Sequence, residues 1–196
     1  MRRWLSFGAI LALLVLPAVA GEVPRKAPEL AVPLPDGRQI LLSQFRGQVV
    51  LIEFLHTTCV HCQHSSVILE RLLKELGPRG FQVIGVAFND NALMLVPDFV
   101  NQFGLTFPVG VGGRDEVLSY LQHPLVKPLY VPQMVIVDRQ GIIRAQHGGE
   151  DDFFTNLEPN LRAVIEVLLK EPAAGQATRP RPRAAKTAAA SRQAAQ

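Results

Sequence analysis

The chain has 196 residues, of which 48% are hydrophobic and 19% charged, enough apolar side chains to fill the core of one ordinary domain. Its formal charge of +3 comes from the two ends, because residues 21–170 carry 13 Lys and Arg against 16 Asp and Glu. A domain with more acids than bases does not indicate a basic surface that would bind the phosphate backbone of a nucleic acid, so we expect no nucleic-acid partner.

The N-terminus has the three-part layout of a secretory signal peptide. Arg2 and Arg3 precede an apolar run over residues 4–16, and small residues then offer a cleavage site after Ala20. We therefore predict that residues 1–20 are a signal peptide and that the protein is periplasmic or otherwise extracytoplasmic. Retention of this segment as a membrane anchor is the alternative, although the run is short for a membrane span.

From residue 28 onward, local patterns predict alternating strands and helices. Alternating apolar residues on both sides of the Asp36-Gly37 pair indicate a β-hairpin, followed by a helical turn at 43–47. Residues 49–55 are apolar except for Glu53, as in a central strand buried on both faces. Apolar residues at helical spacing then predict a helix over 61–76, which Gly77-Pro78 ends.

The second half of the domain continues the alternation. We predict strands at 81–88 and 107–111, helices at 92–103 and 115–121, a proline-rich loop at 123–132, and a hairpin of 134–138 with 142–146. A last helix ends near 169, with a start between 153 and 159 and the acids of 150–152 as caps.

This order predicts an α/β fold with a central mixed β-sheet flanked by helices, in one domain over residues 28–170. The Ala-, Pro- and Arg-rich tail of residues 171–196 contains almost no large apolar side chains. Burial there cannot offset the entropy lost on ordering, so we predict a disordered tail.

The chain has two cysteines, Cys59 and Cys62, just after the predicted central strand. A disulfide between them closes too short a loop to stabilise the fold much, so the spacing indicates chemistry. Unpaired N–H groups and the helix dipole favour an anion at a helix start, so we expect Cys59 to be the exposed thiolate nucleophile. Cys62, one turn later and more buried, is then the resolving thiol.

Three further residues are candidates for roles beside the dithiol. His61 can help to hold negative charge at Cys59, or it is a solvated histidine of the first helical turn. Burial should raise the pKa of Glu53 and let it exchange a proton with Cys62, unless it reaches a sheet edge or a salt bridge. Pro132 precedes a strand, where proline marks an edge or a special turn.

Together these motifs resemble the TlpA/ResA-like group of extracytoplasmic thioredoxin-fold thiol-disulfide oxidoreductases. The resemblance rests on PDGRQILLSQFRG, VVLIEFLHTTCVHC, VPQMVIVDRQGII and the export signal. It implies a thioredoxin-like fold with the buried acid at Glu53, and a cis proline, Pro132, beside the dithiol. It also implies that Val131 offers backbone groups to a bound substrate.

Some residues depart from the pattern of this group, which usually has Trp where this chain has Thr58 and Pro or Gly within the Val60-His61 pair. A Cys-x-His-Cys centre with Val before the cis proline is also similar to periplasmic Dsb-type dithiol oxidases, so the direction of electron flow stays open. Either way, the resemblance implies exchange with protein thiol or disulfide substrates and a membrane or periplasmic redox partner. It implies no cofactor beyond the redox-active Cys59–Cys62 disulfide, and no metal.

The first alternative is a copper-binding metallochaperone of the same fold. Sulfur and imidazole ligands suit copper(I) or zinc, and one short segment carries His56, Cys59, His61, Cys62 and His64. A helix that starts at the dithiol turns these side chains to different sides, which argues against a single closed metal site within this segment. His123 or His147 would then supply ligands from elsewhere in the chain.

A thiol peroxidase is the second alternative, because peroxidases share much of the fold. Their nucleophile normally follows a Pro-x-x-x-Thr-x-x-Cys pattern. In this chain Ile52 and His56 stand at the proline and threonine positions, and both departures count against peroxidase activity.

Overall fold

The computed structural model describes residues 21–172. The predicted signal peptide at 1–20 lies outside the described residues, as does the predicted disordered tail beyond Pro172. Within residues 21–172, no helix combines the length and the apolar character needed to cross a bilayer.

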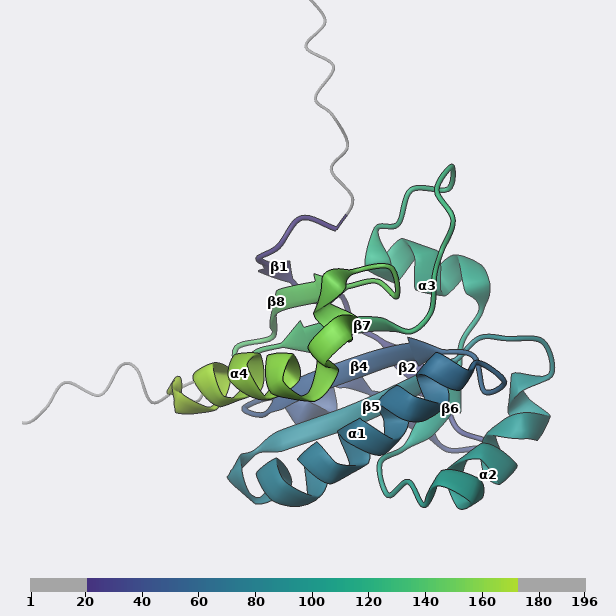
Figure 1. Ribbon diagram of the computed structural model, residues 1–196, viewed down its shortest axis with the longest axis horizontal. Helices are drawn as coiled ribbons and strands as arrows, with labels where there is room; N and C mark the ends of the chain where they lie inside the picture. Colours follow the sequence, from purple (N-terminus) through teal and green to yellow (C-terminus); the bar gives the residue numbers. More distant parts are fainter. Residues whose placement is uncertain (1–20, 173–196) are drawn as a thin grey trace, which may run out of the picture.

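A six-stranded mixed sheet forms the centre of the molecule, in the order β1-β8-β7-β4-β5-β6 (Figure 1). The strands β4, β5 and β6 are parallel, whereas β7 is antiparallel to β4, and β8 and β1 continue the antiparallel half. The carboxyl ends of β4 and β5 therefore lie at the same edge as the start of β7. In chain order the strands are β1 (Arg25–Lys26), β4 (Val49–Leu55), β5 (Phe81–Ala87), β6 (Val109–Val111), β7 (Gln133–Val137) and β8 (Ile142–His147).

Four α-helices cover the two faces of this sheet (Figure 1). Short 3-10 helices follow the N-terminal hairpin, follow α1 and precede α4. The α-helices are α1 (Val60–Leu76), α2 (Ala92–Phe103), α3 (Arg114–Leu121) and α4 (Leu157–Lys170), and the 3-10 helices are Leu42–Phe45, Gly77–Arg79 and Asp152–Asn156.

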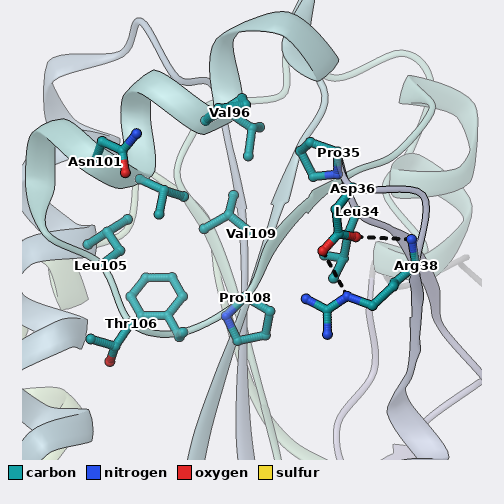
Figure 2. Close-up of a pocket in the computed structure, with 13 residues that line it drawn as sticks. Leu34, Pro35, Asp36, Arg38, Val96, Asn101, Leu105, Thr106, Pro108 and Val109 are labelled. Atoms are coloured by element: carbon teal, nitrogen blue, oxygen red, sulfur yellow. Dashed lines mark hydrogen bonds and ion pairs between the residues drawn. The ribbon is translucent and has the colours of Figure 1, made fainter.

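A separate hairpin of β2 (Ala31–Pro33) and β3 (Gln39–Leu41) packs beside β6. The hairpin turn, α2 and the segment before β6 line an open cavity of about 580 Å³ (Figure 2). Val96, Leu105 and Val109 make its wall apolar, and the Asp36–Arg38 ion pair lies on the hairpin side. None of the predicted catalytic side chains lines this cavity.

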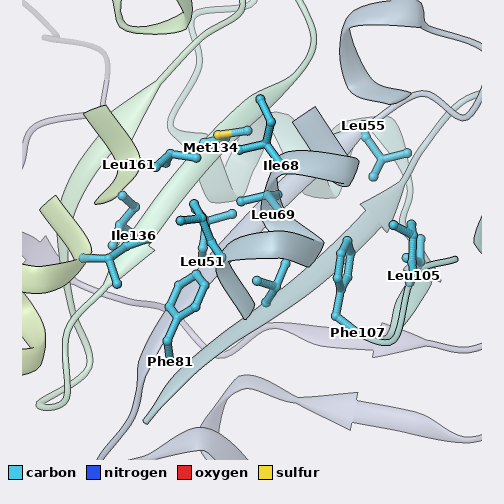
Figure 3. Close-up of a cluster of buried hydrophobic side chains, with 14 of the residues drawn as sticks. Leu51, Leu55, Ile68, Leu69, Phe81, Leu105, Phe107, Met134, Ile136 and Leu161 are labelled. Atoms are coloured by element: carbon cyan, nitrogen blue, oxygen red, sulfur yellow. The ribbon is translucent and has the colours of Figure 1, made fainter. Parts of the chain in front are cut away.

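The alternation of side chains along β4 divides the core into two clusters. Leu51 and Leu55 pack with residues of α1, α2 and α4 on one face of the sheet (Figure 3). Ile52 and Phe54 point to the other face and pack with α3 and the hairpin. All seven residues of β4 are buried, as expected for a central strand covered on both sides.

The predicted α/β fold with its central mixed sheet is confirmed, and the predicted elements occur in the predicted order. Two details differ. The segment before Ala27 contributes β1, a short edge strand that pairs with β8, where the sequence indicated no strand. The strand expected from Phe107 begins at Val109, because Pro108 has no N–H for the ladder, although its carbonyl oxygen accepts a hydrogen bond from Gly85.

Candidate active site

The two cysteines lie at the N-terminus of α1, at the edge of the sheet where β4 ends. Cys59 is the N-cap residue, with an extended backbone, and its carbonyl oxygen accepts the first helical hydrogen bond from the N–H of Gln63 at 2.9 Å. Cys59 is half-buried and Cys62 is fully buried. The arrangement matches the expectation of an accessible first sulfur and a protected second one.

The loop between β4 and the dithiol is held by side chains from its neighbours. The Asn89 side chain, just after β5, accepts a hydrogen bond from the Thr57 N–H at 2.9 Å and donates one to the Thr57 hydroxyl at 3.2 Å. From α1, the Gln63 amide donates to the Thr57 carbonyl oxygen at 3.0 Å. These contacts fix the position of the chain directly before Cys59, and the sequence analysis did not identify either partner.

Glu53 lies on the face of β4 that α1 covers, and it is fully buried. The hydroxyls of Ser65 and Ser66 both donate hydrogen bonds to its carboxyl group, the second at 2.8 Å. Burial raises the pKa of Glu53 to about 7, and the two serine hydrogen bonds oppose this rise. The carboxyl group therefore changes its protonation state near neutral pH, as the sequence analysis expected from its burial.

The second cysteine has surroundings that favour its neutral thiol. Burial raises the pKa of Cys62, and the nearby Glu53 and Cys59 raise it further, while a hydrogen bond from the backbone N–H of His56 acts in the opposite direction. The Ser65 hydroxyl also lies 3.0 Å from the Cys62 carbonyl oxygen, which makes Ser65 a neighbour of both the acid and the thiol-bearing residue. Cys62 therefore needs a proton acceptor before it can act as a nucleophile.

A cis proline faces the dithiol. The Val131–Pro132 peptide bond is cis, as the family resemblance implied, and the Val131 carbonyl oxygen lies 3.9 Å from the Cys59 sulfur. The preceding carbonyl, that of Tyr130, accepts hydrogen bonds from the Gln133 side chain at 2.6 Å and from the Gly149 N–H at 3.3 Å. These bonds hold the backbone of this loop against the sulfur.

Gly149 allows the loop after β8 to approach the back of the cis-proline segment. A Cβ atom at this position would lie 2.8 Å from the Val131 carbonyl oxygen. Such contacts are closer than packed atoms tolerate, so a side chain at position 149 would displace the Val131 backbone. The Gly148-Gly149 pair is visible in the sequence and hints at a close backbone contact, but the sequence does not indicate which segment these glycines approach.

The histidines near the dithiol do not gather around it. His61 and His64 are exposed, whereas the His56 ring packs edge-on against Phe88 with the ring centres 4.4 Å apart. Burial and the charge of Arg114 lower the pKa of His56, and Asp90 partly compensates. The role of His61 stays a prediction.

The more distant candidate ligands have other partners. The His123 ring lies 3.0 Å from the Pro124 carbonyl oxygen, and His147 forms an ion pair with Asp151 at 2.7 Å. Over the described part of the chain, no three His, Cys, Asp or Glu side chains are grouped as metal ligands. Asp151 also caps the 3-10 helix before α4, through the Phe153 N–H.

A small hollow opens beside the dithiol between α1 and α2. Its volume is about 310 Å³, and its lining includes Thr58, Gln63 and Phe99. Thr58, directly before Cys59, lines this hollow, and the Val131 carbonyl oxygen lies 3.9 Å from the Cys59 sulfur.

A family model described as Redoxin matches residues 22–165. The thiol-disulfide oxidoreductase ResA of Bacillus thuringiensis (strain Al Hakam) is 26% identical over 130 residues, which cover 66% of this chain and 71% of that protein. The thioredoxin-like protein YneN of Bacillus subtilis (strain 168) is 25% identical over 168 residues, covering 76% and 91%.

The fold also has counterparts among solved structures. The crystal structure of a thiol:disulfide interchange protein of the thioredoxin family from Chlorobium tepidum TLS superposes with a TM-score of 0.61. The two sequences are 19% identical, and the match covers 76% of this chain and 99% of that one. The architecture described above is therefore thioredoxin-like.

Proposed function

Because this chain belongs to the Redoxin family, we propose that it is an exported thiol-disulfide oxidoreductase acting on protein substrates through Cys59 and Cys62. The observation that carries the proposal is the pairing of a half-buried Cys59 at the start of α1 with a buried Cys62, beside the Val131 carbonyl group. The activity named for the ResA relative supports the same reaction. The signal-like pattern of residues 1–20 supports export.

The first step is attack by the Cys59 thiolate on one sulfur of a substrate disulfide. A new S–S bond forms between Cys59 and the substrate, the substrate's own S–S bond breaks, and its second sulfur leaves as a thiolate that takes a proton. The N-terminus of α1 stabilises the attacking anion. The Val131 carbonyl oxygen is positioned to accept a backbone hydrogen bond from the substrate beside the mixed disulfide.

Resolution of the mixed disulfide requires Cys62 to lose its proton. We propose that ionised Glu53, whose charge lies close enough to raise the pKa of Cys62, accepts this proton. The Cys62 thiolate then attacks the Cys59 sulfur, closes the Cys59–Cys62 disulfide and releases the substrate as a thiol. The substrate gains two electrons and two protons, and the dithiol loses them.

The same steps in reverse oxidise a substrate dithiol, so the physiological direction depends on the reduction potential of the pair. A membrane or periplasmic redox partner is needed to restore the starting state in either direction. No cofactor beyond the disulfide itself takes part in this scheme.

The test uses the full chain equilibrated in glutathione redox buffers, with the thiols then alkylated and counted by mass spectrometry. We expect the pair to titrate as one two-electron couple, near about −270 mV for a reductant or toward about −120 mV for an oxidant. Cys62→Ser should accumulate a mixed disulfide at Cys59, whereas Cys59→Ser should accumulate none. A pair that does not cycle between thiol and disulfide contradicts the proposal.

A further inference from the structure

Exposed apolar side chains gather at the edge of the sheet that carries the dithiol. Within residues 21–172, eight large hydrophobic side chains are exposed, and six of them follow β4 or β5 or precede β7. The pairing of these strands puts all three segments at one edge. The six are Val60, Leu93, Met94, Leu125, Val126 and Tyr130.

The most exposed of these residues lie at the tip of the loop between α3 and β7, residues 122–130, here termed the arm. Leu125 is 84% exposed and Val126 is 93% exposed. The arm stands out from the molecule as the teal-to-green loop after α3 (Figure 1). Among its residues only Lys127 carries a full charge, so an apolar tip is presented with almost no charge around it.

Hydrogen bonds hold the arm at its tip and at both ends. The Lys127 N–H donates to the Pro124 carbonyl oxygen at 3.0 Å and closes a turn around Leu125 and Val126. At the α3 end, the His123 N–H donates to the Leu118 carbonyl oxygen at 2.9 Å. At the β7 end, the Tyr130 carbonyl oxygen takes the two bonds described above. A loop fixed in this way loses little conformational entropy when its tip binds a partner.

The arm leads directly to the residue that faces the reactive sulfur. Val131 is the fifth residue after Val126, so the tip lies within about 18 Å of the Val131 backbone. A polypeptide joined to Cys59 in the mixed disulfide passes beside the Val131 backbone, within reach of this surface. In an extended chain, side chains about five residues from the reacting cysteine reach the same distance.

We propose that the arm is a substrate-binding element that takes apolar side chains of an extended, non-native polypeptide at a distance from its reacting cysteine. This inference rests on the proposed function. A folded protein buries such side chains, whereas an unfolded or incompletely folded chain exposes them beside its cysteines. The near absence of charge on the arm favours apolar recognition over selection of acidic or basic peptides.

The experiment compares wild type with the double variant Leu125→Ser/Val126→Ser, each as the full chain. The substrates are two synthetic peptide disulfides, one with Leu and one with Ser at the positions four to six residues from the cysteine, and glutathione disulfide. Rates are measured by quenching the reduced protein with an alkylating agent. Val167→Ser, at another exposed valine, which lies on α4, is the matched control.

We expect wild type and Val167→Ser to react about tenfold faster with the Leu peptide than with the Ser peptide, in line with partial burial of two aliphatic side chains. The double variant should lose this preference and keep the wild-type rate with glutathione disulfide. A preference that persists in the double variant, or that wild type lacks, overturns the proposal. So does arm-dependent sedimentation with phosphatidylcholine vesicles at unchanged peptide rates, which would make the arm a membrane contact. Failure of all proteins to react with glutathione disulfide would instead overturn the proposed function.

Discussion

The Ser65 hydroxyl joins the buried carboxyl group of Glu53 to the carbonyl group of Cys62, one helical turn after the buried thiol. The acid comes from the strand and the serine from the helix, so the contact exists only where α1 packs on β4. Because the pKa of Glu53 is raised to about 7, the carboxyl group can both accept and return a proton near neutral pH. The resolving step, in which Cys62 loses its proton, is therefore where substitution of these residues should be felt.

Glu53→Gln should slow resolution of the mixed disulfide by about 100-fold, the usual effect of losing a positioned base, and leave the initial attack by Cys59 nearly unchanged. In wild type the resolution rate should rise as the pH passes about 7 and Glu53 ionises, and in the variant this step should vanish. Quenched-flow alkylation separates the two phases. Glu70→Gln is the control, since Glu70 is also a buried acid but binds Thr106. Equal resolution rates in wild type and Glu53→Gln would remove the acid from the mechanism.

Ser65→Ala and Ser66→Ala should each shift the pH dependence of resolution upward. Both hydroxyls donate to the carboxyl group and so lower the pKa of Glu53, and losing one such bond is worth about one pH unit. Resolution rates across a pH series measure the midpoint. Ser119→Ala on α3 serves as the control. Midpoints equal to that of wild type would show that the serine hydroxyls do not lower the pKa of Glu53.

The free energy of unfolding should fall as the pH rises from about 4.5 to about 7 because of Glu53. Its pKa is raised in the folded state, so the folded protein holds a proton that the unfolded chain releases above its ordinary value of about 4.5. The stability contribution is complete below that value and is lost through about pH 7. Relative to Glu53→Gln, wild type should lose about 3 kcal/mol over this range. Urea unfolding of the reduced proteins across the range measures the difference, and a constant difference would mean that Glu53 is ionised throughout.

Gly149→Ala should weaken exchange with peptide substrates. The added Cβ atom meets the Val131 carbonyl oxygen and displaces the backbone that faces Cys59, with a stability loss on the order of 1–3 kcal/mol. Gly113→Ala is the matched control, because its nearest neighbour would be an ordinary 3.5 Å contact. Peptide rates divided by glutathione disulfide rates separate loss of substrate positioning from loss of folded protein. An unchanged ratio in Gly149→Ala would show that Val131 does not position the substrate.

His61→Ala should make the reduction potential more negative, by on the order of 10–30 mV, if the imidazole helps to hold negative charge at Cys59. His64→Ala is the control, since His64 is an exposed histidine of the same helix, two residues beyond the dithiol. Equilibration with glutathione measures both variants under the same conditions. Equal potentials for the two variants and wild type would leave His61 as a solvated residue without a redox role.

Much of this architecture is predictable because strong periodicity determines it. The run from Val49 to Leu55 has the composition of a doubly covered strand, and the same run makes the burial of Glu53 predictable. The partners of Glu53 were not predictable, since serines within a helix have no pattern that reveals what they face. Nor was β1, because two residues carry no periodicity and their pairing depends on the distant β8.

The exposed residues around the site are even less predictable from local sequence patterns than the buried ones. Prolines correctly predicted a loop before Pro132, but apolar residues such as Leu125 and Val126 look the same in sequence whether they are buried or exposed. Their exposure depends on how the loop leaves α3 and returns to β7. Likewise, the contact of Asn89 with Thr57 joins two loops that are adjacent only because β4 and β5 are neighbours.

The alternation of side chains along β4 determines both the packing of the core and the position of the Glu53 carboxyl group. Successive side chains of the strand point to opposite faces, so Glu53 shares its face with Leu51 and Leu55, beneath α1. Inserting or deleting one residue in the first half of this strand would turn the carboxyl group toward α3 and place an aromatic or aliphatic side chain under the dithiol. The number of residues in the first half of this strand is therefore as much a requirement of the site as the acid itself.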